Sequence, residues 1–373
     1  MKIKTILFAF FLIFPSLAAA GEWDIDVSGH AQGLYGYSHR PDRFKSNDKN
    51  NHLVGQGDIS FSAAYTFNDN YSASVNLDVM GGIDQELKDY NQGAWGEEAY
   101  VIADSPYGRL MLGQTFNVDA QFHEGAPEAG AVGINNSEVV DFIRNPNWQR
   151  NSRGTRFATL NTTYINTDGV APKVSYISPA FYNTMLGLTY VPDAYNRRGL
   201  VNKRASYSHD GGFVAALYSA QELGKFKLSG SLGYAEFHDN DKEMSAGLRL
   251  TRGNFSLGGG WRKTYIDGQD KQRRIEVSEQ MPLLFDNYRE GHAWNIGIGY
   301  EIGPYKAALS YFESKAERTP NKDKITVFSN QYQFNQYAEV YLAAAHVDFE
   351  GADKAPADNN QGYAFMAGIG LNF

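Results

Sequence analysis

The side chains that most often carry catalysis or bind metals are scattered along this sequence. Its eight histidines form no H-x-x-x-H pair, no G-x-S-x-G nucleophile elbow is present, and the chain has no cysteine. His30 shares one face of an alternating segment with Ser28, which is a weak hydrolase signal. We therefore expect no enzyme activity, no metal and no cofactor.

Carboxylates are the commonest charged groups, with 42 acidic against 34 basic residues and a formal net charge of −8. Several acids gather in one Gly- and Ala-rich stretch, TFNVDAQFHEGAPEAGAVGINNSEVVDF, at residues 115–142. An acidic chain is a poor partner for nucleic acid, because it repels the phosphate backbone. The same charge balance would favour cations in any pore that the chain forms.

The first 20 residues have the pattern of a secretory signal peptide. Two lysines precede an apolar run from Ile6 to Phe14, and Ala18-x-Ala20 gives a small-residue cleavage motif before Gly21. An N-terminal membrane anchor is the alternative, but the apolar run is short for one. Removal of residues 1–20 leaves a chain of 21–373 and takes the net charge from −8 to −10.

Beyond Gly21, apolar and polar residues alternate in many short runs, a period that indicates β-strands. No stretch reaches the roughly 20 apolar residues of a membrane helix, so a closed barrel is the way left for this chain to cross a bilayer. We predict 16 strands, near residues 24–38, 54–68, 71–82, 95–104, 108–114, 172–178, 181–191, 211–221, 226–238, 244–252, 255–265, 292–301, 304–314, 323–334, 337–349 and 361–373.

The connections between these runs alternate between short polar turns and longer loops, as in transmembrane β-barrels. Aromatic residues gather beside the short turns and again at the far strand ends, which predicts two aromatic girdles. A soluble β-sandwich would have no reason to place aromatics at both ends of nearly every strand. Gly258, Gly260, Gly297 and Gly299 fall on the inward face, where small residues let a loop approach the wall closely.

Four segments resemble the general diffusion porins of Gram-negative outer membranes. They are the terminal strand ending at Phe373, YGRLMLGQTF at 107–116, KVSYISPAFYNTMLGLTYVPDA at 173–194, and GLRLTRGNFSLGGGW at 247–261. The resemblance implies a 16-stranded barrel, a homotrimer in outer-membrane lipid, and a third long loop, about 115–171, folded into the lumen. It also implies that the barrel assembly machinery reads Phe373 as a C-terminal signal.

The resemblance further implies that the segment after Gln114 narrows the pore. We expect its acids Asp119, Glu124 and Glu128 to line that constriction and to attract cations.

Strand parity assigns five basic residues to the lumen wall: Arg109, Lys227, Arg249, Arg262 and Lys306. For Arg249 and Arg262, structural pairing with neighbouring acids is an equally good interpretation. Many porins carry an arginine cluster on early strands, whereas the first four runs here contain no Lys or Arg. The hypothesis that follows is an acidic wall facing the loop, formed by Asp24, Asp26, Asp58, Asp78 and Glu98.

Together these features predict an all-β, outer-membrane porin. It would pass small hydrophilic solutes and ions by diffusion, with a mild preference for cations. A substrate-specific channel for a sugar or an anion is the alternative, and a barrel enzyme is a weaker one.

Overall fold

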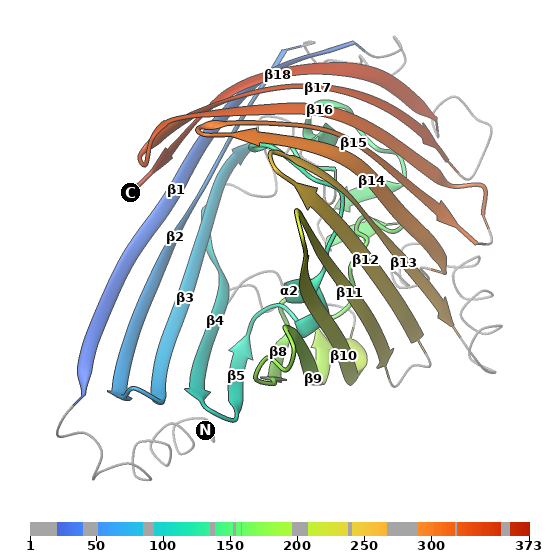
Figure 1. Ribbon diagram of the computed structural model, residues 1–373. Coiled ribbons are helices and arrows are strands. Elements are labelled where there is room, and N and C mark those ends of the chain that lie inside the picture. The colour runs from blue at the N-terminus through green and yellow to red at the C-terminus, as the bar shows by residue number, and fades with distance from the viewer. Residues whose placement is uncertain are drawn as a thin grey trace.

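In the computed structural model, the described residues are 21–39, 51–84, 93–134, 139–151, 154–157, 159–195, 208–237, 241–266, 290–317, 319–351 and 359–373. In this part of the chain, 16 strands close into one antiparallel barrel, and two more, β6 and β7, pair with each other (Figure 1). The predicted signal peptide, residues 1–20, lies outside the described residues.

The elements follow the chain in order and are bounded as follows: β1 (Glu22–His39), β2 (Asn51–Asn68), β3 (Tyr71–Asp84), β4 (Gly93–Ser105), β5 (Gly108–Gln114), α2 (Val118–Phe122), α3 (Val139–Phe142), β6 (Trp148–Asn151), β7 (Gly154–Phe157), β8 (Pro172–Ile177), β9 (Thr184–Tyr195), β10 (Ser208–Leu223), β11 (Phe226–Phe237), β12 (Asp241–Arg252), β13 (Phe255–Ile266), β14 (Gly291–Ile302), β15 (Tyr305–Ala316), β16 (Lys322–Asn335), β17 (Ala338–Glu350) and β18 (Asn360–Asn372).

The last strand closes the barrel against the first. β18 pairs with β17 on one side and with β1 on the other, in a register that runs from His30↔Asn372 to His39↔Tyr363. Phe373 continues this pairing, because its amide and carbonyl each bond to the backbone of Gly29 at 3.0 Å. A chain that ends on a strand therefore leaves no open sheet edge, and the predicted all-β barrel of 16 strands is confirmed.

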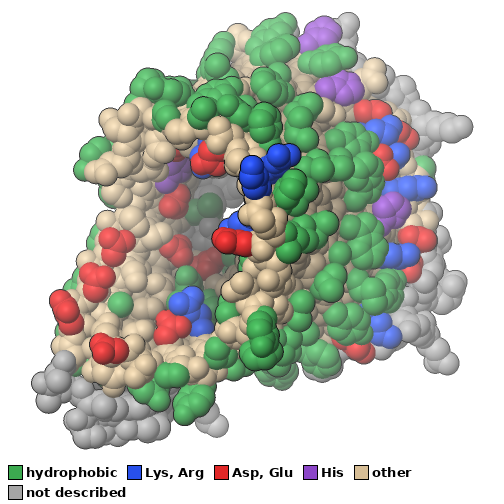
Figure 2. Space-filling model, viewed as in Figure 1, with side chains coloured by type: hydrophobic (Ala, Val, Ile, Leu, Met, Phe, Trp, Pro, Cys, Tyr) green, Lys and Arg blue, Asp and Glu red, His purple; other side chains and the backbone are tan. Residues whose placement is uncertain are grey.

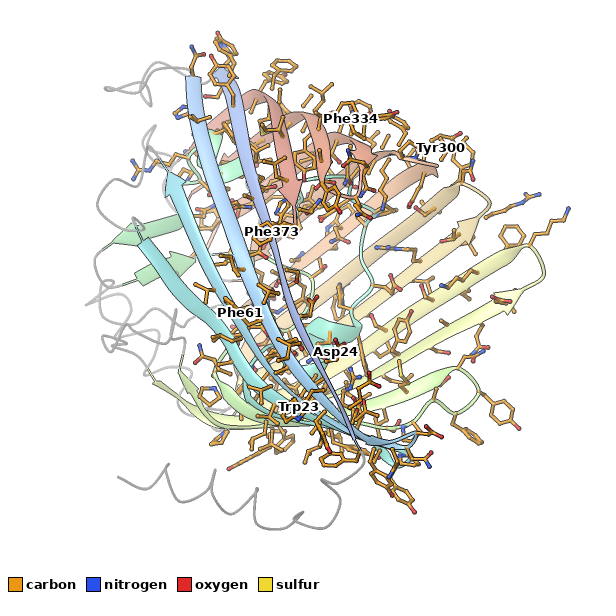
Figure 3. The ribbon with its side chains drawn as sticks, turned by 90° about the vertical axis from the view of Figure 1, so that its left-hand side faces the viewer. Trp23, Asp24, Phe61, Tyr300, Phe334 and Phe373 are labelled. Carbon is orange, nitrogen blue, oxygen red and sulfur yellow. The ribbon has the colours of Figure 1, made fainter. Side chains whose placement is uncertain are left out.

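Alternation along each strand gives the wall two different faces. Large apolar residues point outward and are exposed. A closed belt of such residues is suited to contact with the hydrocarbon core of a membrane rather than with water. Figure 3 shows Trp23, Phe61 and Phe373 on the outer side of this wall. Ser and Gly are the commonest residues at the inward positions of β11–β16, which suits a wall that polar groups must contact.

Exposed aromatic rings mark both ends of the outer face, as predicted. Beside the short turns lie Trp23, Tyr71, Tyr107, Phe181, Tyr182, Phe226, Phe255, Phe334, Tyr337 and Phe373, and toward the long loops lie Tyr35, Tyr37, Tyr190, Phe213, Trp261 and Tyr363. Three of the short turns use a glycine with positive φ, Gly224, Gly253 and Gly303, at +65°, +57° and +54°. Glycine adopts this backbone readily because it has no Cβ, so these turns stay tight.

The structure differs from the prediction in detail. β1 ends at His39 and β2 begins at Asn51, so the first long loop is shorter than expected. The residues that flank this loop continue the pairing of β1 with β2. The segment predicted as one long loop, 115–171, contains α2, α3 and the β6–β7 pair. Among the described residues, no helix is long and apolar enough to cross a membrane.

Candidate functional site

The connection between β5 and β8, residues 115–171, runs along the inner face of the barrel and is called the inner loop here (Figure 1). Its residues 124–129 are bonded, in sequence order, to lumen-facing side chains of successive strands. Three backbone amides of the loop donate hydrogen bonds to the wall: Glu124 to Ser231 Oγ at 3.0 Å, Ala126 to Asn295 Oδ1 at 3.0 Å, and Ala129 to Ser329 Oγ at 3.2 Å. Two backbone carbonyls accept hydrogen bonds from the wall: Gly125 from Arg249 at 3.0 Å, and Pro127 from Ser310 Oγ. The loop thus crosses from β11 to β16 with its backbone groups satisfied by the wall.

The inner loop enters the lumen through a capped helical turn. Asn117 is the N-cap of α2, and its Oδ1 accepts the Ala120 amide at 3.0 Å. The side-chain Nδ2 of Asn117 donates to Ile165 O at 2.9 Å and to Asp168 Oδ1 at 2.6 Å. One buried asparagine therefore joins the two ends of the inner loop.

Glycines on the inner wall leave room for the loop backbone. A Cβ placed on Gly258 would lie 2.7 Å from Gly125 O, and one on Gly299 would lie 2.8 Å from Pro127 Cβ. The same construction on Gly247 would clash with the Glu124 carbonyl. The predicted close approach of the loop is confirmed at Gly258, Gly260 and Gly299, whereas Gly297 faces Ser310 and Leu309 of the neighbouring strand. We call the glycines that contact residues 123–127 of the loop the glycine bed.

Apolar contacts complete the attachment at two places. Val118 and Phe122 of α2 pack against inward residues of β9–β11, among them Val214 and Phe237. Further along, Val132, Ile134, Val139, Phe142 and Ile143 pack against the inner faces of β1, β2 and β14–β18. Burial of these side chains holds the loop to the wall through the hydrophobic effect.

Asp119 is fully buried between the inner loop and the wall, so the prediction that it lines the constriction does not fit its position. Its carboxylate accepts bonds from Ser245 Oγ at 2.6 Å and from the Ile165 amide at 2.7 Å. Burial raises the pKa of Asp119 to about 6, against the opposing effects of these hydrogen bonds and of Arg262. Parity could not reveal this, because α2 turns the side chain toward β12.

His123 follows α2 and is held by the same wall. Its Nε2 lies 3.0 Å from Thr163 Oγ1, and burial, followed by the charges of Arg262 and Arg249, lowers the pKa of His123 to about 4. The imidazole is therefore neutral at physiological pH.

Arg262 is also fully buried, and it ties the wall to the returning half of the inner loop. It pairs with Glu243 at 2.6 Å and donates to Thr162 Oγ1 at 2.8 Å, Asn166 Oδ1 at 2.6 Å and Thr167 Oγ1 at 3.2 Å. The structural pairing interpretation holds for Arg262, which has no surface in the lumen. Its charge is compensated locally, as a buried charge must be.

Sequence reasoning missed a second buried pair. Lys173 Nζ lies 2.7 Å from Asp168 Oδ2 and donates to Gly169 O at 2.6 Å, and neither side chain is exposed. Lys173 occupies an inward position of β8, one residue after Pro172, so strand parity could have predicted that the lysine faces the lumen side of the wall. Its partner could not be predicted, because Asp168 lies in the inner loop.

The other two predicted acids reach the lumen. Glu124 pairs with Arg249 at 3.2 Å and keeps 13% of its side chain exposed, against 36% for Arg249. Glu128 is exposed, and its Oε1 accepts the Ile134 amide at 2.8 Å. The structure therefore brings Glu124 and Arg249 together and leaves Glu128 as an acid on the lumen side of the loop.

Two predicted basic residues lie near the short turns. Arg109 forms an ion pair with Asp104 at 2.7 Å, on adjacent inward positions of β5 and β4. Lys227, at the start of β11, is exposed, and among the described residues it forms no ion pair.

The wall formed by β1–β4 is lined by acids and contains no Lys or Arg. Asp78 accepts a hydrogen bond from Ser60, and Glu98 accepts one from Thr115 Oγ1 at 2.7 Å. Asp58 lies 4.0 Å from His30, whose Nε2 is 3.3 Å from Tyr341 Oη and 3.6 Å from Glu339. Figure 2 shows acidic side chains along this side of a central hollow. His30 thus contacts acids and Tyr341, and no hydrogen bond joins it to Ser28 among the described residues.

A cavity of about 690 Å³ lies between α2 and the rim of short turns. Its lining includes two ion pairs, Asp104–Arg109 and Glu124–Arg249, together with Tyr218. Within the described residues, no group of three or more acidic or histidine side chains is placed to hold a metal ion.

A closed 16-stranded barrel with an apolar outer belt, a polar inner wall and a loop bound inside is a membrane channel. The family model for Gram-negative porins matches residues 5–352, and the chain belongs to that family. The family and the barrel together indicate an outer-membrane porin channel.

Solved structures share the fold at low sequence identity. They include Salmonella typhi OmpF in complex with daunomycin, at a TM-score of 0.62 and 12% identity, covering 94% of this chain and 97% of that one. OmpT of Vibrio cholerae in a trimer form has a TM-score of 0.58 and 12% identity, with coverage of 94% and 99%. An anion-selective porin from Comamonas acidovorans has a TM-score of 0.57 and 12% sequence identity, and the match covers 94% of this chain and 100% of that one. No curated protein matches the sequence.

Proposed function

We propose that this porin is a general diffusion channel for small hydrophilic solutes and ions, that the inner loop sets its narrowest part, and that it prefers cations. The observation that carries the proposal is the attachment of residues 124–129 across the inner faces of β11–β16. A loop held this way occupies part of a lumen that 16 strands would otherwise leave wide.

The charge distribution supports the preference for cations. The acids of β1–β4 have no basic residue among them, and Glu128 adds an acid from the loop. Three inward-facing arginines of the wall are compensated: Arg262 is buried with Glu243, Arg249 pairs with Glu124, and Arg109 pairs with Asp104. A pore wall on which acids outnumber bases concentrates cations.

The same proposal includes export through residues 1–20, assembly as a homotrimer, insertion through the barrel assembly machinery by way of Phe373, and no covalent chemistry. The pairing of Phe373 with Gly29 at the barrel seam is consistent with a role in closure. The trimer rests on the family.

The test is single-channel recording in planar bilayers with a KCl gradient. We expect stepwise, ohmic conductance and a reversal potential of the sign for K⁺ over Cl⁻. Glu128→Gln should lower the K⁺ preference, and the matched change Glu222→Gln, at the rim of short turns, should lower it less. An absence of conductance would contradict the pore, and a Cl⁻ preference would contradict the charge argument.

A substrate-specific channel is the second candidate, and the cavity of about 690 Å³ favours it, because it places two ion pairs beside an aromatic ring. Such a channel would show saturable block of the ion current by one solute. Linear flux for unrelated sugars and amino acids of similar size would favour general diffusion.

A further inference from the structure

The first strand extends beyond the last one at the barrel seam. β18 pairs with β1 as far as Gly29, which exchanges backbone bonds with Phe373. β1 itself begins at Glu22, and β2 accompanies it from that residue onward. Figure 3 shows β1 running on past Phe373 to Trp23. β18 is therefore paired on both sides, whereas Glu22–Ser28, which we call the β1 extension, has a strand on one side only among the described residues.

The free side of the β1 extension presents backbone donors and acceptors. Gly29 turns both its amide and its carbonyl toward Phe373, at 3.0 Å each. Because backbone groups alternate along an antiparallel strand, the amides and carbonyls of Trp23, Ile25 and Val27 point to the same side. No described strand meets them there, and an unpaired strand edge of this kind is a template for pairing with another chain.

The side chains of the β1 extension divide by charge between its two faces. Three large apolar residues face outward, with 62%, 73% and 50% of their surfaces exposed: Trp23, Ile25 and Val27. Three exposed acids alternate with them on the inner face: Glu22, Asp24 and Asp26. Among the described residues, no basic side chain forms an ion pair with these carboxylates. A strand lying against this edge would therefore meet apolar neighbours on its outer face and negative charge on its inner face.

The acids make a second copy of the same edge a poor partner. Two copies paired antiparallel and centred on Ile25 would place Asp24 opposite Asp26 at two points, and like charges directly opposite each other destabilise a sheet. Inward-pointing charges are one means by which sheet edges avoid pairing with their own kind. A strand with Lys or Arg at alternate positions would instead place a positive charge opposite each acid.

We propose that the β1 extension is a docking site for an extended segment of another protein, in which apolar and basic residues alternate. The segment approaches from the short-turn side of the membrane and adds to the sheet as an antiparallel strand in line with β18. Its apolar residues exchange backbone bonds with Trp23, Ile25 and Val27, and its basic side chains lie opposite Asp24 and Asp26. The inference uses the strand edge alone and is independent of the ion selectivity proposed above.

The test measures binding of a labelled synthetic peptide, VKVKVKV, to the full-length mature porin in neutral detergent by fluorescence anisotropy. Three peptides serve as comparisons: VEVEVEV, VKVKVKV N-methylated at its valines, and VKVKVKV N-methylated at its lysines. Methylation at the valines removes the amides that would face β1, whereas methylation at the lysines removes amides on the far side. Hydrogen exchange of residues 22–29 locates the bound peptide.

Two variants change the edge itself. Asp24→Asn with Asp26→Asn removes the charges, and its matched control, Asp69→Asn with Glu222→Gln, removes two exposed acids elsewhere near the short turns. Ile25→Pro removes the central donor of the free side, and β2 does not need that amide, because it points away from β2. Unchanged single-channel conductance verifies that each variant is folded.

We expect the basic peptide to bind about 10-fold more tightly than the acidic one, because it exchanges like-charge for opposite-charge cross-strand pairs. The asparagine pair and Ile25→Pro should each weaken binding about fivefold, from lost charge pairs and a lost backbone bond respectively. The control variant and the lysine-methylated peptide should bind as their parents do, and the valine-methylated peptide should not bind.

Hydrogen exchange adds an independent reading. The amides of Trp23, Ile25 and Val27 should exchange rapidly in the free porin and slowly with the peptide bound. Amides already protected in the free porin would mean that its own chain or a second copy covers this edge, and would overturn the proposal. Absence of peptide binding, equal binding of the two methylated peptides, or equal losses in the asparagine pair and its control would each overturn it as well.

Discussion

The two sides of the barrel use their inner faces differently. The wall of β1–β4 carries acids and no basic residue, and of its acids Glu98 bonds to the inner loop through Thr115. The wall of β11–β16 carries glycines, short polar side chains and Arg262, and the inner loop covers it. The short-turn half of β1 is left to the solvent and sets charge, whereas the wall of β11–β16 is occupied by the inner loop and sets shape.

This division explains why basic residues on the inner face do not imply an anion pore. Arg262 and Lys173 have the parity of lumen residues, yet both are buried and compensated by Glu243 and Asp168. The charges that a permeating ion meets are those that the loop does not cover. Comparing the covered and uncovered sides therefore gives four tests, ordered by the expected size of the effect.

The largest effect should come from Arg262→Met, which leaves Glu243 buried without its partner. Removing one member of a buried pair costs about 3–5 kcal/mol. Arg109→Met breaks an exposed pair with Asp104 and should cost about 0–1 kcal/mol. The measurement is the midpoint of heat-induced unfolding in detergent. The double change Arg262→Met with Glu243→Met should recover much of the loss, and equal losses for the two single arginine changes would contradict the contrast.

A smaller effect is expected from the glycine bed. Gly247→Ala places a Cβ against the Glu124 carbonyl, so the loop must move away from the wall into the lumen. We expect reduced single-channel conductance and a loss of stability of about 1–3 kcal/mol, typical of overpacking. Gly33→Ala is the matched control, because nothing lies within 4 Å of a Cβ there. Unaltered conductance in the Gly247 variant would show that the loop does not set the pore width.

The uncovered wall should control charge selection. Asp58→Asn combined with Asp78→Asn removes two acids from β2 and β3 while keeping the shape of the side chains. We expect the K⁺/Cl⁻ permeability ratio, from reversal potentials, to fall about twofold or more. Asp119→Asn removes one acid from the covered side, where the carboxylate is fully buried, and should leave the ratio nearly unchanged. A larger shift from Asp119 than from the pair would reverse the comparison.

The sequence was sufficient for the barrel because period-two alternation survives on all 16 strands, and the terminal strand at Phe373 required a partner. It was also sufficient for the glycine bed, since Gly258, Gly260 and Gly299 fall on one parity. It could not place Asp119, because a short helix replaces strand parity with a turn of about 100° per residue. Nor could it pair Lys173 with Asp168 or detect β6 and β7, which depend on contacts within the inner loop.

The smallest effect concerns pH, where two buried groups at the ends of α2 oppose each other. The pKa of Asp119 is raised from 3.8 to about 6, so the folded state binds its proton more tightly than the unfolded state does. The stability that this tighter proton binding contributes to the folded state is fully present below about pH 4, and it is lost as the pH rises through 6. The pKa of His123 is lowered from 6.5 to about 4, so its contribution is present above 6.5 and is lost as the pH falls through 4.

Between pH 4 and 6.5 the two dependences have opposite slopes and similar size, so the natural protein should change little in stability. Each single variant removes one slope. Asp119→Asn should become more stable as the pH rises across this window, and His123→Gln should become less stable. Midpoints of heat-induced unfolding at pH 4, 5, 6 and 6.5 measure both slopes. Parallel pH profiles for the two variants would mean that the inner loop does not bury both groups, and that the covered wall is wetter than the contacts of Asp119 with Ser245 and Ile165 imply.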